Sequence, residues 1–273
     1  MMHDVTADSR NIDQLLAIMA ALRHPERGCP WDQEQTFRSI VPHTLEEAYE
    51  VAAAAEADDP AALRDELGDL LFQVVFLSRI AEEQNLFDFY QVARTLSEKL
   101  IRRHPHVFGQ ETDTSDAALA ERWEAIKAQE RNQARGDVPQ SALDDVPVQL
   151  PATTRAQKLQ RRAARAGFDW RHAGEVLDKI QEEFDEVRDA MSSGDRDAIF
   201  HEVGDLLLAC TNLARTLDVD SESALRAANS RFERRYRSME KMAEQDGCRL
   251  ADLPIEEQEA YWVRAKSAEK KGV

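Results

Sequence analysis

The chain has 273 residues, of which 42% are hydrophobic, enough for about two domains with apolar cores. Its 52 acidic residues outnumber its 35 basic residues, and the formal net charge is −17 at pH 7. This charge argues against a nucleic-acid-binding protein, which needs a basic surface for the phosphate backbone. The longest apolar run, residues 70–77, is too short to span a bilayer, so we expect no membrane association.

The cysteines and the first residues of the chain indicate a cellular compartment. Cys29, Cys210 and Cys248 are odd in number and widely spaced, which is typical of a reducing environment. The N-terminal residues lack the apolar segment of a signal peptide. We therefore expect a cytoplasmic protein.

Helical spacing of apolar residues begins at residues 11–23, which predicts a first helix there. Few segments of the chain alternate with a period of two, so the expected fold class is all-α. Near the middle, Gly136, Pro139 and Pro147 interrupt the pattern. We expect residues 10–130 and 151–270 to form two domains, joined by a linker at residues 131–150.

The first domain carries two groups of carboxylates on consecutive predicted helices. They are Glu46, Glu47 and Glu50 in the first group and Glu66 and Asp69 in the second. Within each group the residues are spaced to share one helix face, and a helix-breaking Asp-Asp-Pro turn separates the groups. We expect two antiparallel helices whose acidic faces meet and bind a cation.

The second domain repeats this pattern, and each acidic position is reached by adding 136 to the residue number of its counterpart. The repeated acids are Glu182, Glu183, Glu186, Glu202 and Asp205. Self-similarity at a fixed spacing is the mark of a duplicated unit. We therefore predict an acidic site in each half of the chain.

An apolar helix follows the second acidic group in each half, at residues 70–77 and 206–213. A helix that is apolar nearly all round is expected to be buried. Carboxylates at its start then need a metal, a basic group or protonation to offset their loss of water. Gly68 and Gly204 lie in this pattern, where glycine costs about 1 kcal/mol relative to alanine, so we expect a close helix–helix approach there.

The ligand type indicates which cation would bind. Carboxylates without neighbouring cysteines or metal-spaced histidines suit Mg²⁺, with Mn²⁺ as the alternative, rather than Zn²⁺. Mg²⁺ held by a few carboxylates commonly keeps places for water and substrate phosphates. Phosphate chemistry is therefore the expected use of each site.

Basic residues and tryptophans follow the acidic groups in both halves. They are Lys99, Arg102, Arg103, Trp123 and Lys127 in the first half, and Arg231, Arg234, Arg235, Trp262 and Lys266 in the second. Arginine and lysine bind phosphate oxygens, and a tryptophan can stack on a base. These residues add a phosphate-binding element to the acidic site.

The motif Glu-Glu-x-x-Glu followed by Glu-x-x-Asp resembles that of the all-α nucleoside triphosphate pyrophosphohydrolases, and its tandem arrangement is similar to the MazG family. Further segments carry the same resemblance, at residues 28–32, 102–108, 157–164 and 167–170. The resemblance implies two tandem MazG-like helical domains, each contributing to a four-helix-bundle core on dimerisation. It also implies Mg²⁺-dependent hydrolysis of a nucleoside triphosphate to the monophosphate and pyrophosphate.

The resemblance also implies roles for individual residues. The metal sites would be Glu46, Glu47, Glu50, Glu66 and Asp69 in the first half, and Glu182, Glu183, Glu186, Glu202 and Asp205 in the second. Of these, Glu183, Glu186, Glu202 and Asp205 would be catalytic. The substrate would contact Lys158, Arg161, Arg162, Asn229, Arg231, Arg235, Trp262 and Lys266. We expect the second half to be the working unit, because Ser97 replaces Asn229 in the first half.

The residues favour direct attack by water on the substrate, since no Ser-His-Asp or Cys-His arrangement suggests a covalent intermediate. Which carboxylate acts as the base stays open. A non-catalytic helical regulatory or scaffold protein that binds metal or nucleotide is the alternative function. A narrower alternative is a pyrophosphohydrolase restricted to one nucleotide, such as dUTP.

Overall fold

The computed structural model describes residues 11–109, 115, 122–123, 126, 130 and 141–271. These residues form helices and no strands, so the prediction of an all-α fold is confirmed for them. The chain divides into two compact units, residues 1–136 and 137–273. Residues 131–140 of the predicted linker and Lys127 lie outside the described residues. Of the helices described, none combines the length and apolar composition needed to cross a bilayer.

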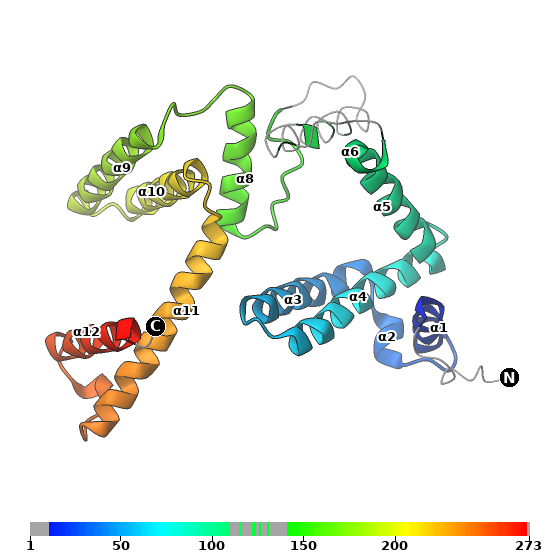
Figure 1. The fold of residues 1–273 in the computed structure, drawn as a ribbon, viewed down its shortest axis with the longest axis horizontal. Coiled ribbons are helices and arrows are strands. Elements are labelled where there is room, and N and C mark those ends of the chain that lie inside the picture. The colour runs from blue at the N-terminus through cyan, green and yellow to red at the C-terminus, as the bar shows by residue number, and fades with distance from the viewer. Residues whose placement is uncertain are drawn as a thin grey trace. The chain divides into compact units, whose positions relative to one another are not determined.

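The first unit is a set of helices around one antiparallel pair, shown in blue to green in Figure 1. Its helices are α1 (Ile12–Leu22), α2 (Pro30–Glu34), α3 (Phe37–Glu56), α4 (Pro60–Glu83), α5 (Phe89–Arg103) and α6 (Pro105–Phe108). Helix α1 matches the helix expected at residues 11–23. Helices α3 and α4 carry the two acidic groups and pack side by side.

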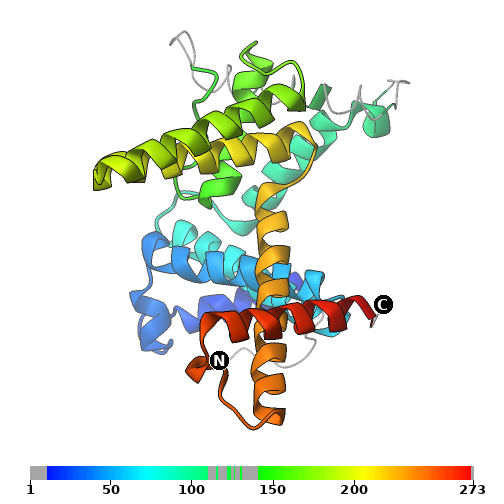
Figure 2. The same cartoon turned by 90° about the vertical axis from the view of Figure 1, so that its left-hand side faces the viewer.

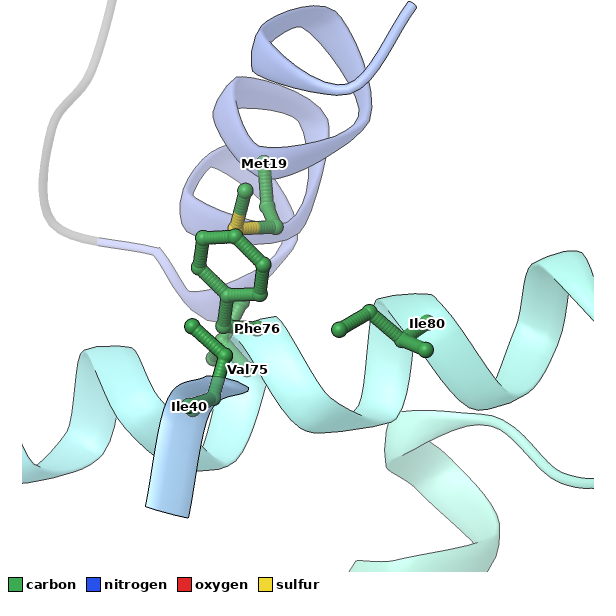
Figure 3. Packing of buried hydrophobic residues seen from close by; sticks show 5 residues of the cluster. All are labelled: Met19, Ile40, Val75, Phe76 and Ile80. Carbon is green, nitrogen blue, oxygen red and sulfur yellow. The ribbon is translucent and has the colours of Figure 1, made fainter. Parts of the chain in front are cut away.

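The core of the first unit lies where α1, α3 and α4 meet. Met19, Ile40, Val75, Phe76 and Ile80 form one cluster of fully buried side chains (Figure 3). Trp31 on α2 packs edge-on against Phe76, with 6.4 Å between ring centroids. This cluster fixes α4, and therefore the acidic residues near its start, against the rest of the unit.

The second unit contains α8 (Ala152–Arg165), α9 (Ala173–Ser193), α10 (Arg196–Thr216), α11 (Ser221–Gln245), the short 3-10 helix η1 (Leu250–Asp252) and α12 (Ile255–Lys271). Helices α9 and α10 are the counterparts of α3 and α4 and pack side by side. Helix α12 packs on the C-terminal half of α11, away from α9 and α10 (Figures 1 and 2). Met239, Ala243, Leu250 and Ala265 form the small core of this α11–α12 hairpin.

The turn between the paired helices is built in the same way in both units. Asp59 and Asp195 cap α4 and α10 by accepting hydrogen bonds from two backbone N–H groups of the first helical turn. The residue before each cap has a positive φ, 52° at Asp58 and 71° at Gly194. Asp and Gly are residue types that adopt this conformation, so the 136-residue repeat extends to backbone geometry.

Two expectations about the apolar helices were wrong for the single chain. In α4, Val75 and Phe76 are fully buried, but Leu71 is 40% exposed, and its counterpart Leu207 in α10 is 64% exposed. A Cβ added at Gly68 or Gly204 would meet no atom within 4 Å, so neither glycine marks a close helix–helix approach. Hydrophobic periodicity identifies an apolar face but does not say whether the same chain covers it.

Candidate metal and phosphate site

In the first unit, the acidic faces of α3 and α4 meet as predicted. Glu47 from α3 and Glu66 and Asp69 from α4 each offer a carboxylate oxygen, and these oxygens lie within 4.8 Å of one another. Glu50 lies close enough to Glu66 for its charge to raise the pKa of that carboxyl group. Glu46 instead lies beside His43, with 3.9 Å between Oε2 and Nδ1. Three of the five predicted acids therefore gather in one place, with Glu50 beside them.

The second unit forms the corresponding group between α9 and α10. Glu183, Glu186 and Glu202 each offer an oxygen within 4.8 Å of the others. Glu183 is buried, Glu202 is half-buried and Glu186 is exposed. Asp205 is exposed and is not part of this group of oxygens, and Glu182 bonds to Lys179 outside it. The structure thus joins three of the five predicted ligands directly.

Burial and neighbouring like charges raise the pKa values of Glu47, Glu66 and Glu186. Burial and then the charge of Asp69 raise the pKa of Glu47, and burial and then Glu50 raise the pKa of Glu66. In the second unit, burial and then the charge of Glu183 raise the pKa of Glu186. A bound cation would relieve this repulsion, and a set of carboxylate oxygens fits a hard divalent cation.

Lys179 is a site residue that the sequence reasoning missed. Its Nζ donates to Glu182 at 2.7 Å and lies 2.8 Å from Glu183, and these hydrogen bonds raise the pKa of the lysine. The corresponding residue of the first unit is His43. The signal was available in the sequence, since Lys179 lies three and four residues before the two glutamates and on their helix face.

Gln73 in α4 also distinguishes the first site from the second, where Ala209 takes its place. The buried side chain of Gln73 donates from Nε2 to Glu47 at 3.4 Å. Its Oε1 is buried and has no hydrogen-bond partner among the residues that the structure describes. A neutral amide thus donates to Glu47 in the first site, whereas the second site has the positive charge of Lys179 beside Glu183.

The predicted substrate-binding residues lie on three helices of the second unit. Lys158 and Arg161 are exposed on α8, and Arg162 donates to the backbone carbonyl of Asp144. Asn229 and Arg231 are exposed on α11, and Lys266 is exposed on α12. Arg235 and Trp262 meet in the α11–α12 hairpin, with the guanidinium carbon 5.5 Å from the ring centroid.

A carboxylate that the sequence reasoning missed completes this arrangement. Glu269 pairs with both Arg234 and Arg235, at 3.1 and 2.7 Å. The first unit has the same arrangement, in which Glu130 pairs with Arg102 and Arg103, and Arg103 lies 5.3 Å from the ring centroid of Trp123. Each glutamate follows its tryptophan by seven residues, a second repeat that spacing alone could have revealed. We call these the Glu269 cluster and the Glu130 cluster.

The Glu269 cluster does not lie beside the acidic group of its own chain. Helix α12 packs against α11, whereas α10 packs against α8 and α9. Both views show α12 on the half of α11 remote from the α9–α10 pair (Figures 1 and 2). Arg235 lies 14 residues into α11, which is about 21 Å along the helix axis from its start. The single chain therefore separates the carboxylates from the Glu269 cluster.

Fold and site together define an all-α protein with a duplicated acidic helix pair and arginine clusters suited to phosphate. The model of the MazG nucleotide pyrophosphohydrolase domain matches residues 35–108 and 173–239, which contain the two helix pairs. The chain belongs to the MazG family.

Several curated proteins are similar over nearly the whole chain. A nucleoside triphosphate pyrophosphohydrolase of Escherichia coli K12 is 48% identical over 262 residues, covering 94% of this chain and 98% of that protein. A nucleoside triphosphate pyrophosphohydrolase/pyrophosphatase MazG of Thermotoga maritima is 42% identical over 258 residues, covering 94% and 96%. A nucleoside triphosphate pyrophosphohydrolase of Mycolicibacterium smegmatis is 32% identical over 271 residues, covering 94% and 72%.

Proposed function

We propose that the chain is a Mg²⁺-dependent nucleoside triphosphate pyrophosphohydrolase that acts mainly through its second half. It converts an NTP or dNTP to the monophosphate and pyrophosphate. The near full-length similarity to enzymes of that name supports the activity. The observation that carries the choice of half is the group of Glu183, Glu186 and Glu202 with Lys179 at its edge.

The donor set of the second site fits a hard divalent cation. Glu183, Glu186 and Glu202 would hold Mg²⁺ or Mn²⁺, and Asp205 lies one turn after Glu202 on the same helix. The bound cation would neutralise phosphate charge and lower the pKa of an attacking water. The first site, with Glu47, Glu66 and Asp69, would hold a cation through the same residue types.

The protein's own groups then orient the reactants. Lys179 supplies a permanent positive charge beside the acidic group, where a phosphate oxygen would otherwise meet carboxylates. The group offers more carboxylates than an incompletely coordinated Mg²⁺ needs, so one can orient the water and accept its proton. No covalent intermediate is needed, because water attacks phosphorus directly and pyrophosphate leaves.

We also propose that the active form is a homodimer in which the site is shared. The carboxylates and the Glu269 cluster lie apart in one chain, so a second chain is needed to bring them together. Large apolar side chains exposed around α9 and α10 support this, since soluble monomers seldom leave such surfaces open. They include Leu177, Phe184, Phe200, Val203, Leu207 and Leu208.

The net charge supports two further parts of the proposal, that the protein binds neither nucleic acid nor membranes. The widely spaced cysteines support a cytoplasmic location. A non-catalytic regulatory role suits the first half alone, where Ser97 replaces Asn229 and His43 replaces Lys179.

Product analysis tests the proposal. The wild type and the Asp69→Asn and Asp205→Asn variants are incubated with a panel of NTPs and dNTPs and Mg²⁺, with EDTA as the control. We expect monophosphate and pyrophosphate, lost with EDTA and in Asp205→Asn but retained in Asp69→Asn. Loss only in Asp69→Asn would move the site to the first half. Nucleotide binding without turnover would instead indicate a non-catalytic regulatory protein.

A further inference from the structure

We propose that Glu269 is a positioning residue for the substrate: it holds the Nε edge of Arg235 and leaves the terminal guanidinium nitrogens free to bind phosphate oxygens. This role rests on the proposed function, because it concerns the affinity of the enzyme for its nucleotide substrate. Glu269 itself would touch neither the substrate nor the metal.

The geometry of Arg235 supports this role. Its Nε donates to Oε2 of Glu269 at 2.7 Å, and neither Nη1 nor Nη2 donates a hydrogen bond to any residue that the structure describes. The guanidinium also lies over Trp262, and the arginine side chain is only 21% exposed. A carboxylate on one edge and an aromatic ring on one face leave the far edge of the guanidinium as its open side.

That open edge has the donors that phosphate recognition requires. The two terminal nitrogens of an arginine can donate in parallel to two oxygens of a phosphate. Holding the long side chain in place beforehand reduces the rotamer freedom that is lost on binding. An arginine fixed through Nε is therefore a better phosphate ligand than the same arginine free in solvent.

Glu269 orients two arginines without cancelling their charge. Arg234 donates through Nη2 to Oε1 of the glutamate at 3.1 Å, so each carboxylate oxygen takes one guanidinium. Hydrogen bonds from Arg235 and then Arg234 lower the pKa of Glu269, which keeps the carboxylate ionised. Two guanidinium groups against one carboxylate leave the cluster with a net positive charge.

The scaffold beneath the cluster restricts its movement. Trp262 packs with the buried residues Met239 and Ala265 of the α11–α12 hairpin. Phe232 lies 5.7 Å from the ring of Trp262 on the side of α11. Arg235 is therefore oriented by groups that are themselves fixed, as a preorganised ligand site requires.

The Glu130 cluster shows the alternative use of the same residues. Arg103 donates to Glu130 through both Nε and Nη2, and Arg102 does so through the same two nitrogens. The carboxylate thus occupies two nitrogens of each guanidinium, and the cluster is closed by its own ion pairs. Among the described residues, Arg235 has no hydrogen bond from either terminal nitrogen, whereas Arg103 already uses Nη2.

The test compares the full-length wild type with Glu269→Gln. Steady-state KM and kcat are measured for the dNTP that the wild type hydrolyses fastest, and Kd is measured for its α,β-methylene analogue. We expect KM and Kd to rise about tenfold, the size expected for losing a hydrogen bond to a charged group, with kcat changed less than twofold. Glu259→Gln is the control, an equal loss of charge at an exposed position of the same helix.

A double-mutant cycle separates positioning from general stability. Glu269→Gln is also introduced into an Arg235→Lys background, where the Nε edge no longer exists. We expect the second substitution to change Kd less than twofold there, because its effect acts through Arg235. A fold defect would instead weaken binding equally in both backgrounds, and thermal unfolding of each variant reports it directly.

Three results would overturn the proposal. A lower KM in Glu269→Gln would show that the glutamate competes with phosphate. An unchanged KM and Kd would show a surface ion pair without a role in binding. Equal weakening in the Arg235→Lys background would show that Glu269 acts through the fold. If the wild type binds the analogue but turns over no nucleotide, the proposed function fails while the binding comparison still decides the role of Glu269.

Discussion

The two halves of the chain share a scaffold and differ in what surrounds the carboxylates. Helices α3–α4 and α9–α10 have the same turn and the same acidic positions at a spacing of 136 residues. Beside these acids the first half has His43, and the second has Lys179. A duplicated acidic helix pair can therefore keep its carboxylate positions while the side chain beside them diverges.

The cores of the two halves differ in a related way. Phe76 is fully buried in the first half, and the corresponding position of the second half is Asn212. Both helix pairs also leave apolar side chains exposed, such as Leu45 and Leu67 in the first pair and Phe200 and Leu207 in the second. The first helix pair therefore takes part in a buried cluster of large side chains that has no counterpart at Asn212 in the second pair.

The largest contrast between the halves is expected at the carboxylates. Glu202→Gln should lower kcat about 10²- to 10³-fold, the range seen when a charge-stabilising group is lost, and Glu66→Gln should change it less than twofold. Steady-state hydrolysis by both variants, with equal Mg²⁺, makes the comparison. Equal losses would show two working sites and would remove the distinction between the halves.

The next contrast concerns stability. Phe76→Ala should lower the free energy of unfolding by about 3–5 kcal/mol, because it removes the centre of a fully buried cluster. Asn212→Ala, at the corresponding position, should lower it by about 1 kcal/mol or less. Urea unfolding followed by circular dichroism measures both. A larger effect at Asn212 would contradict the view that the second half has the weaker core of its own.

A smaller effect on activity is expected at Lys179, the lysine beside the acidic group of the second half. Lys179→His should raise KM for the triphosphate about tenfold at pH 8, because it removes a permanent positive charge. The expected loss of binding free energy is about that of one hydrogen bond to a charged group. His43→Lys, the reciprocal change, should leave KM unchanged. Steady-state kinetics of the two variants test this. A gain of activity in His43→Lys would show that the first site lacks only a lysine at this position.

The smallest expected effect is the pH dependence of the Glu130 cluster. Hydrogen bonds from Arg103 hold the pKa of Glu130 at about 2, below its ordinary value of 4.5. A carboxyl group whose pKa is lower in the folded state stabilises the fold at pH values above its pKa in the unfolded chain. This contribution is lost as the pH falls from 4.5 towards 2. Glu130→Gln should therefore unfold at a lower temperature than the wild type at pH 6, and the difference should vanish near pH 2. A difference that persists at low pH would assign it to packing instead.

The sequence alone was sufficient for the fold class, the duplication and the family. Helical spacing, the 136-residue repeat and the paired acidic motifs are all local patterns, and local patterns survive in the sequence. The same patterns predicted that acidic faces of paired helices meet. The structure confirms this for two groups, Glu47, Glu66 and Asp69 in one half and Glu183, Glu186 and Glu202 in the other. The roles of the individual residues stay predictions until the variants are measured.

Only the tertiary structure decided which groups these residues meet. The pairing of Glu269 with Arg235 joins residues 34 positions apart, and the pairing of Glu130 with Arg103 joins residues 27 apart. The open space at Gly68 and Gly204 and the exposure of α10 depend on which helices cover a face, which periodicity does not encode. Contacts between helices depend on how the helices pack. This packing determines that Glu130 bonds two nitrogens of Arg103, whereas Glu269 bonds only Nε of Arg235.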